Sequence, residues 1–170
     1  MGLTNLNNIG LIVICAILLL SCNLFKDDDL SLKRENYNGT LYLNGYYYNA
    51  GIEGNTTRLM FFSNGVVLNA GTSNNSLNDF EASLRKTEKI EKLKRMKFMW
   101  GIYQIKENNI ILERFTPGPP RNTTFLSYGK ILNDSTFIIN RIGEEKMKYS
   151  LVYHFREFSP KPDSIVSFID

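Results

Sequence analysis

The sequence predicts an all-β domain, an antiparallel up-and-down meander that closes into a barrel of about eight strands. Three observations support this fold class. From Thr40 onward, short runs of aromatic and β-branched residues are separated by polar turn signals, which is typical of antiparallel sheets. Most runs follow one another directly, so hairpins connect them rather than parallel crossovers. A meander of this length tends to close because closure removes exposed strand edges.

Eight runs are expected to form strands, and Ser164–Phe168 is a candidate for a further short strand. Asn64-Gly65 is the clearest turn between runs, because both residues tolerate the positive φ of a type I′ hairpin turn. Three prolines between Phe115 and Thr123 exclude a strand there. The predicted strands are Thr40–Asn49, Thr57–Ser63, Val66–Ala70, Phe98–Lys106, Ile110–Phe115, Thr124–Leu132, Thr136–Ile142 and Lys148–Phe158.

Side-chain alternation predicts which strand faces are buried. In the run from Lys148 to Glu157, apolar residues occupy every second position and polar residues the others, as a strand with one buried face requires. Tyr103 and Ile105 are expected on a buried face, and Gly101 is expected to mark a kink or a close backbone approach. The apolar positions of the last long run are Tyr149, Leu151, Tyr153 and Phe155, and the polar ones include His154 and Arg156.

One helix is expected to interrupt the meander over about residues 76–96. The segment has no Gly or Pro, and it spaces Leu77, Phe80 and Leu84 three and four residues apart, as in an amphipathic helix. Ser76, with Asp79 three residues later, is a candidate amino-terminal cap. Packing against the barrel is the expected role of this helix, and binding a partner is the alternative.

The amino-terminal segment predicts export and lipidation. An apolar run of 12 residues ends in Leu19-Leu20-Ser21-Cys22, which suits a signal-peptide core and is shorter than the roughly 20 residues of a spanning helix. A small residue followed by cysteine resembles the lipobox of bacterial lipoproteins. That resemblance implies that residues 1–21 are a signal peptide and that Cys22 carries lipid, which attaches the protein to a membrane. A buried hydrophobic helix is the alternative interpretation.

Composition divides the rest of the chain into a tether and a folded domain. Residues 22–38 are polar and charged, so we expect a flexible tether there, and residues 39–170 are expected to form the barrel domain. Cys15 lies in the segment predicted to be removed and Cys22 would be used by lipid, so no disulfide is expected. A net charge of +3 is too small to indicate nucleic-acid binding.

Two kinds of short motif resemble those of exported Bacteroidetes proteins. Lys26-Asp27-Asp28-Asp29 resembles the export signal that follows the lipidated cysteine of surface lipoproteins. Display at the cell surface and a periplasmic location both remain open. Asp134-Ser135-Thr136 and Asp163-Ser164-Ile165 resemble O-glycosylation sites, with Ser135 and Ser164 as acceptors. Ordinary solvated tether and turn residues are the alternatives.

A resemblance to lipocalins rests on two stretches of the domain. Leu43-Asn44-Gly45-Tyr46-Tyr47 is similar to the Gly-x-Trp opening of that family, with tyrosine in place of tryptophan. Trp100-Gly101-x-Tyr103-x-Ile105, followed by Asn109-Ile110-Ile111-Leu112-Glu113, resembles the mid-barrel hairpin of small lipocalin-like lipoproteins. The resemblance implies an up-and-down barrel of about eight strands, in some members with an apolar ligand in its mouth.

The residues give no support for catalysis or for a metal site. His154 is the sole histidine and is expected on a polar strand face, whereas a zinc site usually needs three or four ligands. Carboxylates are scattered through the sheet region, and the sequence does not say whether two of them converge. No cofactor or metal is therefore expected. The carboxylates in question are Glu113, Glu144, Glu145 and Glu157.

These observations predict a lipoprotein anchored in the outer membrane of a bacterial envelope, with a non-catalytic, lipocalin-like barrel. One hypothesis is that the barrel binds a small hydrophobic or glycan ligand in a cavity lined by tyrosines and phenylalanines. The other hypothesis is a structural or protein-interaction role, in which the barrel is filled by side chains. The helix or the Pro117–Pro120 loop would then contact another envelope protein. An enzyme would need polar groups that converge in a pocket.

Overall fold

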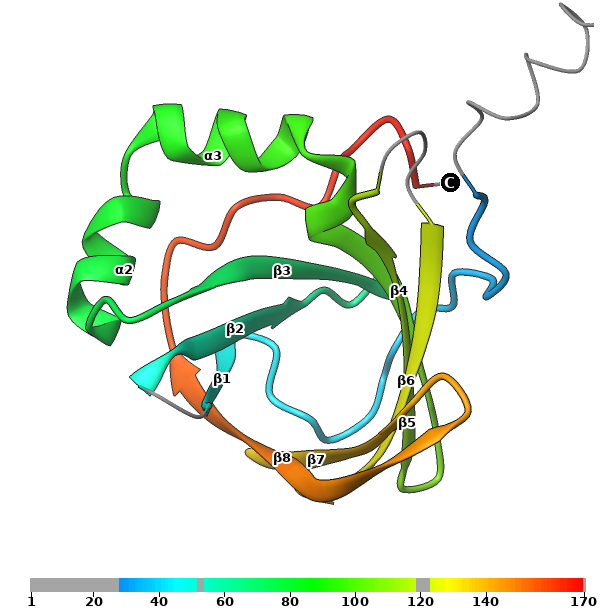
Figure 1. Ribbon diagram of the computed structural model, residues 1–170. Coiled ribbons are helices and arrows are strands. Elements are labelled where there is room, and N and C mark those ends of the chain that lie inside the picture. Colours follow the sequence, from blue (N-terminus) through cyan, green and yellow to red (C-terminus); the bar gives the residue numbers. More distant parts are fainter. Residues whose placement is uncertain (1–27, 52–53, 119–122, 170) are drawn as a thin grey trace, which may run out of the picture.

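Eight antiparallel strands close into one barrel (Figure 1). The computed structural model describes residues 28–51, 54–118 and 123–169. Consecutive strands are neighbours throughout, and β1 pairs with β8, where Tyr47 lies opposite Phe155. The predicted all-β, up-and-down, lipocalin-like barrel is confirmed. Its strands are β1 Gly45–Ala50, β2 Thr56–Phe61, β3 Val66–Ser73, β4 Trp100–Lys106, β5 Asn109–Thr116, β6 Thr123–Asn133, β7 Thr136–Ile142 and β8 Glu145–Glu157.

One end of the barrel is closed by the residues that precede β1. These residues were predicted to belong to the first strand, but β1 begins only at Gly45. Residues 40–44 instead run across the barrel (Figure 1), and Leu41 is buried against its interior. The backbone N–H of Tyr42 donates to the carbonyl of Asp134 in the β6–β7 turn at 2.9 Å. We call this end the closed end; the β1–β2, β5–β6 and β7–β8 connections lie at the opposite, open end.

Two helices replace the single helix predicted over residues 76–96. Helix α2 spans Leu77–Leu84, helix α3 spans Thr87–Arg95, and a 3-10 turn, η2, follows at Lys97–Met99. Between the two helices Lys86 is extended, with φ −87° and ψ 121°. A straight helix over the whole segment would be about 30 Å long. The bend instead lets the apolar residues of both helices reach the curved barrel wall.

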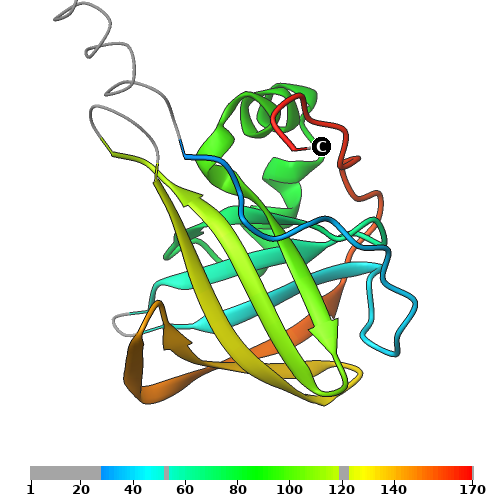
Figure 2. The same cartoon turned by 90° about the vertical axis from the view of Figure 1, so that its right-hand side faces the viewer.

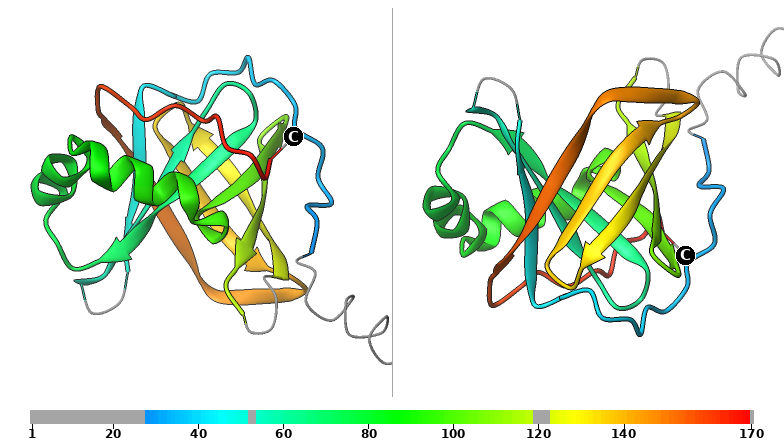
Figure 3. Two further views of the ribbon diagram at one scale, coloured as in Figure 1. Left: turned by 90° about the horizontal axis from the view of Figure 1, so that it is seen from above. Right: turned by 90° about the horizontal axis from the view of Figure 1, so that it is seen from below.

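The barrel wall has an apolar core on each of its two faces. The interior core fills the barrel towards its closed end, and the outer core lies between the outside of β1–β4 and the helices (Figures 2 and 3). Neighbouring residues alternate between them, so Tyr47 is interior and Tyr46 is outer. Trp100 holds the end of α3, because its indole N–H donates to the carbonyl of Leu93 at 2.8 Å. The largest fully buried interior side chains are Tyr47, Leu59, Phe61, Tyr103, Ile110 and Phe137.

The alternation predicted for the last long strand holds for three of its four apolar residues. Leu151, Tyr153 and Phe155 face the interior core. Tyr149 does not, and 71% of its surface is exposed. The β7–β8 ladder jumps from Ile139 opposite Leu151 to Arg141 opposite Lys146, so the residues in between leave the regular sheet. His154 is exposed, as predicted for its polar strand face.

The carboxy-terminal segment runs over the outside of the barrel and is not a ninth strand. Residues 164–168, the candidate for a further strand, have no strand pairing. Phe158 and Ile169 are instead buried in the outer core. The ammonium of Lys161 fixes the middle of this segment, because it donates to the carbonyls of Leu43 at 2.5 Å and Phe61 at 2.6 Å. It also lies 4.3 Å from the ring centre of Phe62.

The burial of Lys161 makes the stability of the fold dependent on pH. Burial lowers the pKa of Lys161 from 10.5 to about 8. The unfolded chain therefore binds a proton that the folded chain releases between pH 8 and 10.5, and the contribution of Lys161 to the free energy of unfolding rises with pH across this window. Relative to Lys161→Met, the native protein should gain about 2–3 kcal/mol between pH 7 and pH 10. Urea denaturation of both proteins checks this, and a difference that does not change with pH would contradict it.

Candidate functional site

The closed half of the barrel interior is filled by aromatic rings. The ring centre of Phe61 lies 4.9 Å from Tyr103 and 5.5 Å from Phe137, and Phe137 stacks on Tyr153 at 4.7 Å. The hydroxyl of Tyr103 donates to the carbonyl of Phe62 at 2.8 Å, so this buried phenol has a partner. Burial raises the pKa of Tyr103. Because rings occupy this half, the tyrosines and phenylalanines predicted to line a cavity pack against one another there.

Arg114 is a charged residue inside the barrel. It lies on β5 opposite Gly101 of β4 and Phe125 of β6, on the same strand face as the interior residue Leu112. Its guanidinium lies 5.0 Å from the ring centre of Phe125. A Cβ atom at Gly101 would lie 2.7 Å from the Cγ atom of Arg114. The close approach predicted at Gly101 is therefore found, and it leaves room for the arginine stem.

The environment of Arg114 is unfavourable for a cation. Among the described residues its Nε has no hydrogen-bond partner, and burial lowers the pKa of the guanidinium, an effect that the Tyr153 phenol partly offsets. In the described part of the chain Glu113 is the only buried acid, and it lies on the outer face of β5. A buried charge is costly unless it is paired. The interior of the barrel therefore holds a cation without a buried counter-ion.

Four side chains on the interior face of the barrel wall are partly exposed. Arg114 and Phe125 are each partly exposed, and so are Met147 and Leu151, which pack against the interior core from β8. Arg114 is two residues from the last residue of β5, at the open end. We call Arg114, Phe125, Met147 and Leu151 the mouth. It combines one guanidinium with three apolar side chains, which suits an anionic group attached to an apolar body.

The structure describes only some of the residues predicted to carry lipid, the export signal and glycans. Cys22, Lys26 and Asp27 lie outside the described residues. Asp28 and Asp29 are described, at the start of the segment that leads onto the barrel. The hydroxyl of Ser135 donates to Asn133 Oδ1 at 3.0 Å, and that of Ser164 accepts from Asn64 Nδ2 at 3.0 Å. Lipidation, export and O-glycosylation remain predictions.

Glu113 holds the amino-terminal segment against the outside of the barrel. Its side chain is only 2% exposed, and its carboxylate accepts hydrogen bonds from the N–H of Leu32 at 2.6 Å and the hydroxyl of Ser31 at 3.0 Å. We call residues 29–34 the strap. The other candidate carboxylates, Glu144, Glu145 and Glu157, are exposed. Glu113 is thus explained by a structural role and not by a catalytic pair.

Replacing Glu113 by alanine should release the strap. The N–H of Leu32 would lose its acceptor, and we expect a loss of about 1–3 kcal/mol in the free energy of unfolding. Amide hydrogen exchange at residues 29–34 should accelerate much more than in the β-strands. Glu157→Ala is a matched control, because Glu157 is exposed and its Oε1 contacts only the Asn44 side chain, at 3.2 Å. Unchanged exchange in the strap of Glu113→Ala would refute the proposed role of this carboxylate.

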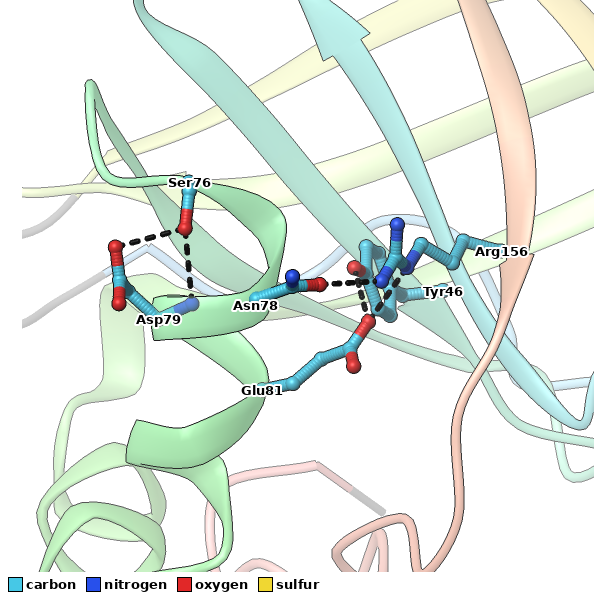
Figure 4. Close-up of polar contacts among 6 residues, drawn as sticks. All are labelled: Tyr46, Ser76, Asn78, Asp79, Glu81 and Arg156. Carbon is cyan, nitrogen blue, oxygen red and sulfur yellow. Dashed lines mark hydrogen bonds and ion pairs between the residues drawn. The ribbon is translucent and has the colours of Figure 1, made fainter.

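A polar clamp joins α2 to the outer wall of the barrel (Figure 4). The carboxylate of Glu81 accepts from the hydroxyl of Tyr46 at 2.9 Å and from Nε of Arg156 at 2.6 Å. Nη2 of Arg156 donates to the side-chain oxygen of Asn78 at 2.7 Å. The hydrogen bond to Glu81 raises the pKa of Arg156. These side chains satisfy one another, so the cluster is a structural joint and offers no group for chemistry.

The helix that carries this clamp begins at the predicted cap. The Ser76 hydroxyl accepts from the N–H of Asp79 at 3.1 Å and lies 2.7 Å from its carboxylate (Figure 4). A serine at this position satisfies one of the unpaired N–H groups of the first helical turn. Glu81 and Asn78 therefore belong to a helix whose first residue is set by the Ser76 cap.

Arg58 is a buried arginine whose Nε, like that of Arg114, has no hydrogen-bond partner among the described residues, but whose two Nη atoms are hydrogen-bonded. It is 1% exposed on the outer face of β2. Its Nη1 donates to the carbonyl of Thr56 at 2.9 Å and to Oγ of Ser73 at 3.0 Å, and its Nη2 donates to the carbonyl of Asn75 at 2.6 Å. These acceptors tie β2 to the segment before α2. Arg58 thus has an evident structural role, whereas Arg114 has none of this kind.

Neither arginine was identified from the sequence as a site residue. Arg114 belongs to a run with apolar residues on both strand faces, Ile110-Ile111-Leu112-Glu113-Arg114-Phe115, so alternation alone does not say which face is interior. The feature that could have shown Arg114 to be an interior residue is the pairing of β4 with β5, which places Gly101 opposite Arg114. A glycine opposite a large charged residue leaves space for the stem of the large side chain on that strand face.

Neither known proteins nor the described residues of this chain point to a family, a metal site or a membrane-spanning helix. No protein-family model, curated protein or solved structure matches the chain. Across residues 28–51, 54–118 and 123–169, no three His, Cys, Asp or Glu side chains gather as they would around a metal ion. In these same ranges no helix has the length and apolar character needed to cross a bilayer.

Proposed function

We propose that this protein is a lipid-anchored envelope lipoprotein whose barrel binds a small hydrophobic ligand with an anionic group. The observation that carries the proposal is the position of Arg114, a partly exposed residue on the interior face of the barrel whose buried Nε has no hydrogen-bond partner in the described chain. A carboxylate bound there would supply a charge-assisted hydrogen bond. It would also offset the cost of leaving the cation unpaired.

The apolar part of the ligand would lie on the mouth residues. Phe125 contributes a ring face beside the guanidinium, and Leu151 and Met147 contribute aliphatic surface from β8. A glycan would need several polar groups to pair with its hydroxyls. Of the buried polar side chains near this end, Asn49 already donates to the carbonyl of Val152 at 2.6 Å. A hydrophobic anion therefore fits the mouth better than a glycan does.

Calorimetric titration of the full chain tests the ligand class. Dodecanoate and dodecan-1-ol have the same chain length and differ in charge, and a neutral oligosaccharide represents the glycan class. We expect one saturable site for dodecanoate, with an affinity at least about tenfold higher than for the alcohol. Equal affinity for dodecanoate and the alcohol, or binding of the oligosaccharide alone, would contradict the proposal.

Lipid anchoring is tested separately at Cys22. Mass spectrometry of the chain recovered from bacterial membranes should find an amino-terminal peptide that begins at Cys22 and carries lipid. Cys22→Ser should stay unprocessed and lack that mass. A mature chain that retains Ser21 and a free Cys22 thiol would contradict anchoring and leave the barrel site untouched.

A structural role is the second candidate, and the packed aromatic rings of the closed half favour it. Phe61, Phe137 and Tyr153 leave no room for a ligand at that depth. A barrel used only as a scaffold would bind none of the three titrants, and crosslinking in intact cells would recover an envelope protein attached to it. Saturable binding of dodecanoate would instead favour the first candidate.

A further inference from the structure

A groove lies on the outside of the barrel, between the two ends of the described chain. The strap forms one side, the carboxy-terminal residues Phe168 and Ile169 form the other, and Ile102 and Phe115 of β4 and β5 form the floor. Its volume is about 520 Å³. Figures 1 and 2 show the blue strap and the carboxy-terminal end close together beside β4. This groove is distinct from the mouth, because its floor is the outer face of the wall.

The groove combines an apolar floor with a cationic rim. Leu30 and Leu32 of the strap add to the apolar surface of the floor residues. Among the described residues that line the groove, three are cations, Lys33, Arg34 and Lys97, and one is a carboxylate, Asp29. Lys33 and Arg34 are exposed, so their charges can meet a partner from solvent. Apolar surface next to a positive rim is complementary to an anionic amphiphile.

The position of the groove along the chain brings it close to a membrane. Five residues lie between Cys22 and Asp28, and a fully extended chain over these six residue steps spans about 20 Å. If Cys22 carries lipid, the start of the strap lies within that distance of the bilayer. The strap itself is held against the barrel by Glu113. The groove therefore lies in the part of the domain that the anchor holds nearest to the lipid.

We propose that the groove binds an anionic phospholipid of the membrane that holds the anchor. Its phosphate lies against Lys33 and Arg34, and an acyl chain lies against Leu30, Leu32 and Phe168, which line the groove and are partly exposed. This inference rests on the lipid anchoring proposed above. The lipid attached to Cys22 itself suits the groove less well, because an acylated cysteine brings no negative charge to the cationic rim.

Photocrosslinking tests the proposal in the lipidated chain. A benzoylphenylalanine at position 168 replaces the half-buried Phe168 in the groove, and the same residue at position 149 replaces the exposed Tyr149, which does not line it. The chain is placed in nanodiscs of phosphatidylcholine with one third phosphatidylglycerol, and mass spectrometry identifies the adducts. We expect position 168 to crosslink phosphatidylglycerol in preference to phosphatidylcholine. Position 149 should give few lipid adducts.

Charge reversal provides the decisive control. Lys33→Glu combined with Arg34→Glu should reduce the phosphatidylglycerol adduct at position 168 by at least about fivefold. The same variant should leave dodecanoate binding at the mouth unchanged. Equal adducts with the two lipids, no lipid adduct at position 168, or an adduct that survives charge reversal would each overturn the proposal.

A soluble lipid distinguishes a groove that binds no anionic lipid from a chain in which Cys22 carries no lipid. Dihexanoyl phosphatidylglycerol below its micelle concentration can reach the groove without any anchoring. If Cys22 carries no lipid, crosslinking of this probe at position 168, lost on charge reversal, would still support an anionic lipid site. Absence of that crosslink would refute lipid binding in the groove, whether or not Cys22 carries lipid.

Discussion

Replacing Arg114 by methionine is expected to weaken the binding of dodecanoate by at least about tenfold and, at the same time, to stabilise the ligand-free barrel by about 1 kcal/mol or more. Both effects have one cause, the unpaired cation inside the barrel. Without a ligand, Nε of Arg114 is buried and has no hydrogen-bond partner within residues 28–51, 54–118 and 123–169. With a carboxylate bound, the same group makes a charge-assisted pair. Titration calorimetry and urea denaturation measure the two effects independently.

Two matched variants show whether the charge or the geometry matters. Arg114→Lys keeps the charge and loses the planar fork, so we expect an intermediate affinity. Arg141→Met removes an exposed arginine that lies over the Tyr128 ring at 3.7 Å, and it should leave dodecanoate affinity unchanged. A destabilised Arg114→Met variant that binds dodecanoate normally would show that Arg114 is a structural residue.

Replacing Phe137 by alanine is expected to cost about 3–5 kcal/mol in the free energy of unfolding. The ring is fully buried, and its centre lies 5.2 Å from Tyr47, 5.5 Å from Phe61 and 4.7 Å from Tyr153. Its removal leaves a cavity that these stiff neighbours cannot fill. Urea denaturation at constant pH measures the loss.

The exposed Tyr149 supplies the control for this core substitution. Tyr149→Ala removes a ring of similar size that is 71% exposed, so it should change stability by no more than about 0.5 kcal/mol. A loss below about 1 kcal/mol for Phe137→Ala would mean that the closed half is loosely packed. In that case a ligand could enter deeper than the mouth.

The barrel could be predicted from the sequence because its hairpins are local. Asn64-Gly65 and the other polar turns separate runs whose alternation already assigns Tyr153 and Phe155 to one face. Local turns between consecutive strands determine an up-and-down order. Closure then follows from the pairing of β1 with β8, which removes the last two strand edges.

Other features depend on contacts that no local pattern encodes. The helix breaks at Lys86 because two apolar faces must follow a curved wall, and Tyr149 leaves the interior because the β7–β8 ladder shifts. Arg114 could not be recognised as an interior residue, since both faces of β5 carry apolar side chains. Glu113 and Phe115 on the outer face of β5 are buried as well as Ile110 and Leu112 on the inner face, which makes the two faces look alike in the sequence.

The most direct test of an anion site in the barrel is the ¹⁵N NMR signal of Arg114 Nε. A bound carboxylate at the mouth should shift the Nε–H resonance downfield and slow its exchange with water, with the same saturation curve as dodecanoate binding by calorimetry. Dodecan-1-ol should have little effect on this resonance. Saturable binding of dodecanoate that leaves the Arg114 Nε–H unchanged would contradict the proposed site.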